Sequence, residues 1–288
     1  MKKFLKFLSK AIIVVVVIAV VLRIIVVMSG EGEDVIMSNS IAVLRLEGVI
    51  IDTKDLDKKL KKLDANEKVK GIILEINSPG GVIAPTQVIY NRIMKMKKPV
   101  YSVMESVAAS GGYYIAVAAD EVYALESTTT GSIGVIMQYS NVEELMSKIG
   151  IKSVVFKSGK LKDVPSPTRD LSYSEKEYMQ AMISEFYEQF LRDVLKRRSI
   201  SEDKLRDLAD GRVFSGRQAV ELKLIDKIGT REEAVVDMKN ELGIQDLEVK
   251  ELYDKDESLL SQLFTKAAVL RSELIPNGGF YYIYKPGL

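Results

Sequence analysis

The chain has 288 residues, of which 47% are hydrophobic, with 41 Lys and Arg against 40 Asp and Glu and no His, Cys or Trp. This length suffices for one large domain or two small ones. The absence of Cys and His excludes a disulfide framework, a thiolate nucleophile, a Ser-His-Asp triad and a metal site built on either residue. A hydrolase of this composition must take its general base from Lys, Asp or Glu.

The N-terminus has the features of a membrane anchor. Residues 11–28 are apolar except for Arg23 and follow four lysines within the first ten residues. As a helix they would span roughly 27 Å, close to the hydrocarbon thickness of a bilayer. We expect residues 1–10 to stay cytoplasmic and residues 11–28 to form an uncleaved single-pass helix, with the body outside the cytoplasm. The alternative is a cleavable signal peptide, whose apolar core is usually shorter.

The body after the anchor is mildly acidic. Without the five bases of residues 1–28, the chain has 36 basic and 40 acidic residues. A body with no basic stripe argues against a nucleic-acid partner. Residues 29–40 are polar and contain glycine, which is typical of a linker.

From residue 41 onward, apolar runs alternate with segments of helical periodicity. We expect strands at 41–46, 69–76, 100–104, 121–125, 133–137 and 153–157, and helices at about 56–63, 82–97 and 111–119. Such alternation predicts an α/β fold with a mainly parallel sheet covered by helices. We expect this domain to cover residues 41–245.

The later part of the domain is predicted to be helical, at 174–198, 201–208, 215–222 and 230–242. An apolar stripe along the first of these helices indicates core packing. The later helices would either cover the sheet or mediate assembly. Residues 246–288 form a C-terminal tail, and the aromatic cluster at 280–284 indicates packing or a partner surface.

Two glycine-rich segments are candidates for a catalytic site. Residues 77–81, Asn-Ser-Pro-Gly-Gly, join a predicted strand to a predicted helix, and their glycines would let the backbone approach a ligand. A plain turn explains them equally well. Ser110 has small neighbours at the start of a predicted helix, where Gly111 can supply an amide to an oxyanion hole. The alternative is that Ser110 only caps the helix.

A third segment, residues 156–163, contains Lys160 and Lys162. A lysine at its ordinary pKa of about 10.4 is protonated at neutral pH, so a lysine base must be desolvated. Ordinary surface charge is the alternative for both residues.

Taken together, these segments resemble the signal peptide peptidase A family of membrane-anchored serine proteases, whose core fold is shared with the Clp protease and the crotonases. The resemblance covers about residues 41–242. It is carried by the segments 77–81, 108–114 (Ala-Ala-Ser-Gly-Gly-Tyr-Tyr), 130–135 (Thr-Gly-Ser-Ile-Gly-Val), 157–159 with Lys162-Asp163, and 211–219.

The resemblance implies a Ser-Lys dyad, with Ser110 as nucleophile and Lys162 as general base; Lys160 is the second candidate for the base. It implies an oxyanion hole made by the amides of Gly81 and Gly111. Thr130 or Ser132 would then position the lysine. No metal or cofactor is implied.

The resemblance also bears on assembly and substrate. Long members of the family carry two copies of the fold and this chain carries one, which implies a homo-oligomer in which Ser110 of one subunit meets Lys162 of a neighbour. We therefore expect a membrane-anchored serine endopeptidase that cleaves remnant signal peptides by acyl-enzyme hydrolysis. The alternatives are a protease specific for one membrane protein and a non-catalytic, crotonase-like scaffold or binding module.

Overall fold

The computed structural model describes residues 36, 38–252 and 280–284. The predicted cytoplasmic segment, the predicted anchor at 11–28 and most of the predicted linker lie outside these residues. The chain divides into two compact units, Met1–Met37 and Ser38–Leu288, and all elements below belong to the second. No helix in the described residues combines the length and the apolar character needed to cross a membrane.

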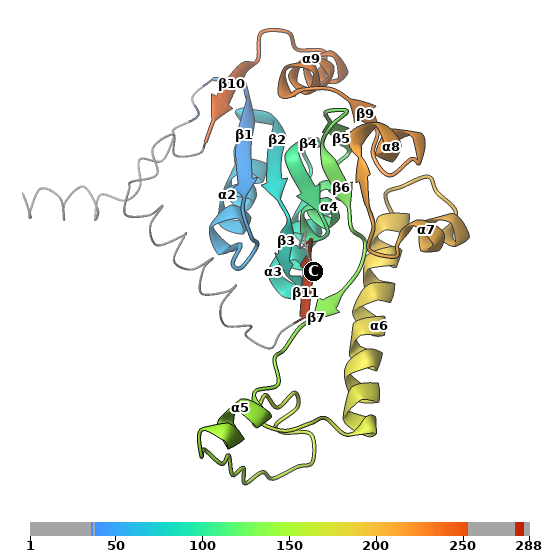
Figure 1. The fold of residues 1–288 in the computed structure, drawn as a ribbon. Coiled ribbons are helices and arrows are strands. Elements are labelled where there is room, and N and C mark those ends of the chain that lie inside the picture. Colours follow the sequence, from blue (N-terminus) through green and yellow to red (C-terminus); the bar gives the residue numbers. More distant parts are fainter. Residues whose placement is uncertain (1–35, 37, 253–279, 285–288) are drawn as a thin grey trace, which may run out of the picture. The chain divides into compact units, whose positions relative to one another are not determined.

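A mixed, mostly parallel sheet forms the centre of this unit (Figure 1). Its main path runs in the order β10-β1-β2-β4-β5-β9, with every neighbouring pair parallel. A short strand, β6, pairs parallel with the end of β4 and antiparallel with β8. The strands are β1 (Ser40–Glu47), β2 (Val69–Ser78), β4 (Val100–Ala109), β5 (Glu121–Ala124), β6 (Thr129–Gly131), β8 (Val213–Ser215), β9 (Lys227–Ile228) and β10 (Glu248–Glu251). The predicted α/β class is confirmed.

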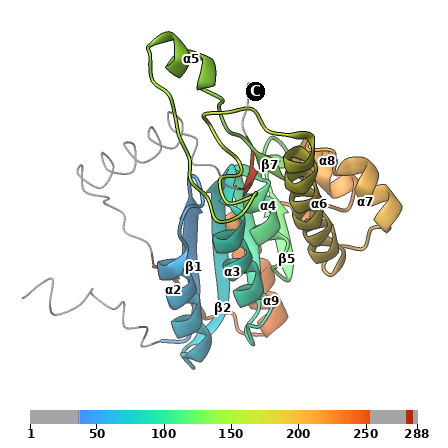
Figure 2. The ribbon, with the colours of Figure 1, turned by 90° about the horizontal axis from the view of Figure 1, so that it is seen from below.

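Helices cover both faces of this sheet, because alternate residues of each strand point to opposite sides. On one face lie α2 (Lys54–Ala65), α3 (Ile83–Ile93) and α4 (Gly111–Ala116), side by side in Figure 2. On the other lies α9 (Arg231–Leu242), whose buried Ala234 and Met238 pack against side chains of the central strands, namely Ile41, Val43, Ile73, Tyr101, Val103 and Tyr123.

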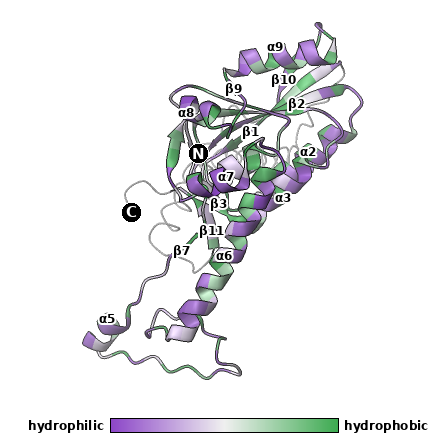
Figure 3. Cartoon of the chain, turned by 90° about the vertical axis from the view of Figure 1, so that its right-hand side faces the viewer, coloured by the Kyte–Doolittle hydropathy of each residue, from purple (hydrophilic) through white to green (hydrophobic). Residues whose placement is uncertain are grey.

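The helix α6 (Tyr173–Leu195) begins at a capping box made by Ser172 and Glu175. Figure 3 shows hydrophilic and hydrophobic residues interspersed along it. Phe190 and Val194 of its apolar stripe are fully buried, which confirms core packing for this end of the helix. After it come α7 (Glu202–Leu208) and α8 (Gly216–Glu221). The late helices were thus predicted to within a few residues.

The structure differs from the prediction after β6. The strand expected at 133–137 is reduced to β7 (Ile136–Met137), which is followed by α5 (Glu143–Lys148). The strand expected at 153–157 is wrong, because these residues have no regular secondary structure and are exposed, Phe156 by 95%. An apolar run forms a strand only where another strand pairs with it, and within the described residues none does.

A second, small sheet has the order β3-β11-β7. It is antiparallel and consists of β3 (Gly80–Val82), β11 (Phe280–Ile283) and β7. The predicted C-terminal tail therefore supplies β10 to the large sheet and β11 to the small one. These two sheets meet at the turn that precedes α4, where the candidate site lies.

Candidate active site

Ser110 lies in the sharp turn between β4 and α4, with φ 53° and ψ −113°. Its amide donates a hydrogen bond to the Gly131 carbonyl at 2.7 Å. Ser110 occupies the N-cap position, but its side chain makes no capping hydrogen bond, so the helix-cap alternative is wrong. A non-glycine residue at positive φ is strained and is retained mainly at functional sites. A serine on a strained strand-to-helix turn is the arrangement of a nucleophile elbow.

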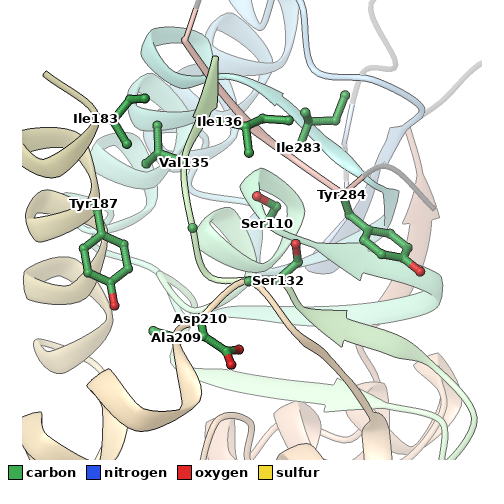
Figure 4. A pocket seen from close by; sticks show the side chains of 12 residues that line it. Ser110, Ser132, Val135, Ile136, Ile183, Tyr187, Ala209, Asp210, Ile283 and Tyr284 are labelled. Atoms are coloured by element: carbon green, nitrogen blue, oxygen red, sulfur yellow. The ribbon is translucent and has the colours of Figure 1, made fainter. Parts of the chain in front are cut away.

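Ser110 lines a pocket of about 420 Å³ together with Ser132 (Figure 4). The Ser132 backbone also has a positive φ, 50°, and its amide donates to the Arg212 carbonyl at 2.8 Å. Thr130, the other candidate for positioning a lysine, lies outside the pocket lining and donates its hydroxyl to the Ala108 carbonyl at 2.7 Å. Of the two, only Ser132 shares the pocket with the nucleophile candidate.

The two glycines expected to form an oxyanion hole are neighbours in space. A Cβ built on Gly111 would lie 3.1 Å from the Gly81 amide nitrogen. A Cβ built on Gly80, whose φ is 96°, would lie 2.6 Å from the Gly111 amide nitrogen. Only glycine allows such close approach of two backbones. The turn is held by the Ser78 hydroxyl, which accepts from the Gly80 amide at 3.1 Å and donates to the Gly48 carbonyl at 2.6 Å.

The pocket offers one carboxylate and no lysine among the described residues that line it. The carboxylate is that of Asp210. Its hydrogen bonds from the Arg212 guanidinium lower its pKa to about 2. A carboxylate with so low a pKa is a weak base for a serine hydroxyl. Within the described residues, the pocket thus contains a nucleophile candidate without a suitable base.

Neither candidate lysine lines this pocket, and both belong to the irregular stretch that follows α5. In Figure 1 this stretch lies beyond β7, away from the large sheet. The ammonium of Lys157 is occupied, since it donates to the Asp163 carboxylate at 2.6 Å. Lys160 and Lys162 are exposed, and among the described residues neither ammonium has a partner. The chain alone therefore does not bring Lys162 to Ser110.

Sequence reasoning missed several pocket residues. Tyr187 and Asp210 carry no motif that marks them, and Ile183 belongs to the α6 stripe that indicates core packing. Ile283 and Tyr284 also line the pocket. The aromatic cluster at 280–284 signalled packing, but nothing in the sequence showed against which element it packs.

Comparison with known protein families shows to which class of enzyme the chain belongs. The model of peptidase family S49 matches residues 92–245, more than half of the chain, and the Clp protease model matches residues 38–144. The chain belongs to peptidase family S49. It is a serine-type peptidase, and its fold is that of the Clp proteases.

Individual relatives agree with membership of family S49. The putative signal peptide peptidase SppA of Enterococcus faecium is 38% identical over 230 residues, which are 74% of this chain and 67% of the relative. Protease 4 of Haemophilus influenzae is 33% identical over 245 residues, covering 79% of this chain and 40% of the relative. The chloroplastic serine protease SPPA of Arabidopsis thaliana is 32% identical over 204 residues, 70% of this chain and 30% of the relative.

Proposed function

We propose that this S49 peptidase is a signal peptide peptidase that is anchored in the membrane by residues 11–28. Its substrates are remnant signal peptides and other apolar peptides, which it cleaves on the extracytoplasmic side of the membrane. The observation that carries the proposal is the strained turn that holds Ser110 beside the glycines of two different loops. A match to sequence motifs alone would not show this arrangement of Ser110 and the glycines.

In the proposed reaction, the Ser110 hydroxyl attacks the carbonyl carbon of the peptide bond and passes its proton to the neutral amine of Lys162. The amides of Gly81 and Gly111 donate hydrogen bonds to the oxyanion that forms. The protonated lysine then gives its proton to the leaving amine. Water attacks the resulting ester with the lysine again as base, which releases the product and restores Ser110.

We infer that Lys162 comes from a neighbouring subunit. Three observations support this: the Ser110 pocket contains no lysine among the described residues, Lys162 is exposed and unpaired among them, and the stretch before it exposes apolar side chains. The apolar side chains include Val154 and Phe156, exposed by 67% and 95%. Exposed apolar runs of this kind are typical of interfaces. Proteases of the Clp type are typically oligomeric.

The proposed dyad is tested by labelling the full chain with a fluorophosphonate, which reacts with activated serines, and locating the adduct by peptide mass spectrometry. The matched variants are Lys162→Ala and Lys160→Ala, which remove the same group two positions apart. We expect labelling at Ser110 in the wild type and in Lys160→Ala, and about a hundredfold slower labelling in Lys162→Ala.

Other outcomes would overturn specific parts of the proposal. Slow labelling in Lys160→Ala alone would move the base to Lys160. Absence of labelling in a verified oligomer would contradict the proposed nucleophile. A digest of several unrelated synthetic signal peptides tests the substrate class, because an enzyme specific for one membrane protein would leave most of them intact.

A further inference from the structure

Lysines from two separate segments gather at one edge of the large sheet. Residues 61–70 and 94–99 contain seven lysines and only two acidic residues. The first segment ends α2 and begins β2, and the second joins α3 to β4. We call this group the lysine edge; its members are Lys61, Lys62, Lys68, Lys70, Lys95, Lys97 and Lys98. The mildly acidic net charge of the body hides this local excess, because the two segments meet only in the fold.

Hydrogen bonds hold the two segments of the lysine edge together. The Lys97 amide donates to the Asp64 carboxylate at 3.0 Å, and the Lys98 ammonium donates to the Leu63 carbonyl at 2.6 Å. The exposed lysines whose ammonium groups have no ion-pair partner within the described residues are Lys61, Lys68, Lys95 and Lys97. Such a group of like charges, fixed on one surface, attracts an anionic partner.

Other basic side chains near the starts of the strands are neutralised. Arg197 forms an ion pair with Asp120 at 2.9 Å, just before β5 begins. Lys250 of β10 pairs with Glu248 of the same strand at 2.6 Å. The unpaired positive charge is therefore concentrated where β2 and β4 begin.

The chain enters the domain at the lysine edge. Figure 1 shows β1, β2 and β4 side by side and running in the same direction, so their first residues share one edge of the sheet. Ser40, the first residue of β1, donates its amide to the Lys68 carbonyl at 2.9 Å. Eleven residues separate Ser40 from the predicted anchor at 11–28, and they reach at most about 40 Å when fully extended. The lysine edge is thus tethered to the membrane surface from which the proposed anchor emerges.

The candidate active site lies at the opposite edge of the sheet. The strands β2 and β4 have ten residues each and run from the lysine edge to Ser78 and Ala109, at the two turns of the site. A strand of this length spans about 30 Å. Ile51 marks the same end, because the amide of the preceding residue, Ile50, donates to the Gly80 carbonyl at 2.9 Å.

We propose that the lysine edge binds the anionic headgroups of a phospholipid bilayer and so orients the domain with Ser110 directed away from the lipid surface. Each lysine near an anionic surface strengthens binding about fivefold, and the tether raises the local concentration of that surface. A soluble polyanion would be attracted by the same lysines, but only the bilayer is tied to this edge by the chain. The site then receives peptide segments that have left the bilayer. The inference rests on the proposed function for the anchor and for the role of Ser110.

The first test measures which edge of the sheet meets the lipid. The chain has no Cys, so one introduced cysteine carries a fluorophore at a chosen place. Ala65→Cys reports from the lysine edge and Ile51→Cys from the edge of the site, and both residues are exposed. Each labelled full chain is placed in nanodiscs of phosphatidylcholine, with or without phosphatidylglycerol, that contain lipids with a nitroxide headgroup as quencher.

We expect the probe at Ala65 to be quenched at least about threefold more strongly in the anionic discs at low salt. High salt should remove this difference, because it screens exposed charges. The probe at Ile51 should respond to neither change. Equal quenching at Ala65 in the two kinds of disc, or a response at Ile51 alone, would overturn the proposal.

The second test removes charge at matched positions. Lys68→Gln with Lys97→Gln takes two charges from the lysine edge, and Lys176→Gln with Lys204→Gln takes two exposed charges from α6 and α7. The loss of two lysines from the edge should weaken attachment roughly 25-fold and bring quenching at Ala65 down to its value in neutral discs. The control pair should leave quenching unchanged, and both pairs should keep the oligomeric mass and the labelling of Ser110. Equal quenching in the two pairs would contradict the role of the lysine edge.

The outcomes separate this inference from the proposed function. If Ser110 is never labelled but the probe at Ala65 responds to anionic lipid, the proposed nucleophile fails and the lipid contact stands. If the chain does not enter the discs, the anchor is contradicted, and the same probes with vesicles of the two compositions then test the lysine edge alone. A response to soluble polyphosphate without a response to anionic vesicles would overturn the proposal, because the partner would then be a soluble polyanion.

Discussion

The carboxylate of Asp210 accepts hydrogen bonds from Arg212 at 2.8 Å (Nε to Oδ1) and 2.5 Å (Nη2 to Oδ2), at the edge of the pocket that Ser110 lines. Both side chains are exposed. This ion pair bears directly on which group can activate the serine, because it lowers the pKa of the pocket's carboxylate to about 2.

We expect Asp210→Asn to keep peptidase activity within about threefold of the wild type, and Lys162→Ala to lose at least about a hundredfold. The asparagine keeps the size of the side chain but has no basic oxygen. The measurement is kcat/KM for one fluorogenic peptide at neutral pH. A hundredfold loss in Asp210→Asn, with an unchanged melting temperature, would make the carboxylate the base and contradict the lysine dyad.

The backbone strain at Ser110 predicts a difference in stability between two inactive variants. Ser110→Gly removes the Cβ and with it the strain of the positive φ, whereas Ser110→Ala keeps a Cβ in the same strained conformation. We expect the glycine variant to have a free energy of unfolding about 1 kcal/mol above that of the alanine variant, measured by urea unfolding. If the alanine variant were equally stable, the turn would not be strained.

Because α4 lies close to β2 at Gly112, we expect a larger side chain at this position to destabilise the protein. A Cβ at this position would lie 2.6 Å from the Ser78 carbonyl oxygen, a backbone atom that cannot move independently. We expect Gly112→Ala to lower the free energy of unfolding by about 1–3 kcal/mol. Gly159→Ala is the control, because a Cβ there would have no atom within 4 Å. Equal free energies of unfolding for Gly112→Ala and Gly159→Ala would show that the backbone at Gly112 shifts without cost to admit a Cβ.

We expect low pH to weaken the contacts that hold residues 157–171, the stretch that contains Lys162. Arg169 bridges this stretch to α6, donating to Glu175 at 2.6 and 2.9 Å and to Asp163 at 3.0 Å. Its hydrogen bonds lower the pKa of Glu175 from its usual 4.5 to about 2. The stabilisation is therefore complete above about pH 4.5 and is lost as the pH falls toward 2.

Hydrogen exchange of residues 157–171 at pH 5 and pH 3, corrected for intrinsic exchange rates, tests this link. We expect faster opening at pH 3 in the wild type. In Glu175→Gln, which cannot be ionised, opening at pH 5 should already be raised and should change less with pH. A Glu175→Gln chain with the wild-type pH dependence would show that Glu175 does not hold the stretch.

The elements that the sequence predicted well are those with a strong local signal. The residues of β2 form an apolar run that is buried almost throughout, and α9 ends at Gly243, which adopts the left-handed conformation of a helix C-cap. The two turns of the candidate site were likewise recognisable in the sequence, because each contains two adjacent glycines, at 80–81 and 111–112. In each case the neighbouring residues alone determine the local structure.

The elements that it did not predict depend on distant partners. The three residues of β6 carry no periodicity, and their pairing with β4 and β8 defines them as a strand. The run containing Val154 and Phe156 has the composition of a strand but no partner within the described residues. For β11 the aromatic composition was evident, but its place between β3 and β7 is a tertiary relationship.

The most direct test of the central claim is complementation between two inactive variants, Ser110→Ala and Lys162→Ala, each as the full chain. Each is expected to be inactive alone. If Lys162 of one subunit completes Ser110 of its neighbour, a co-assembled equal mixture contains wild-type sites and should recover about a quarter of the wild-type peptidase activity. No recovery in a mixture shown by mass spectrometry to contain both variants in one oligomer would contradict the shared site.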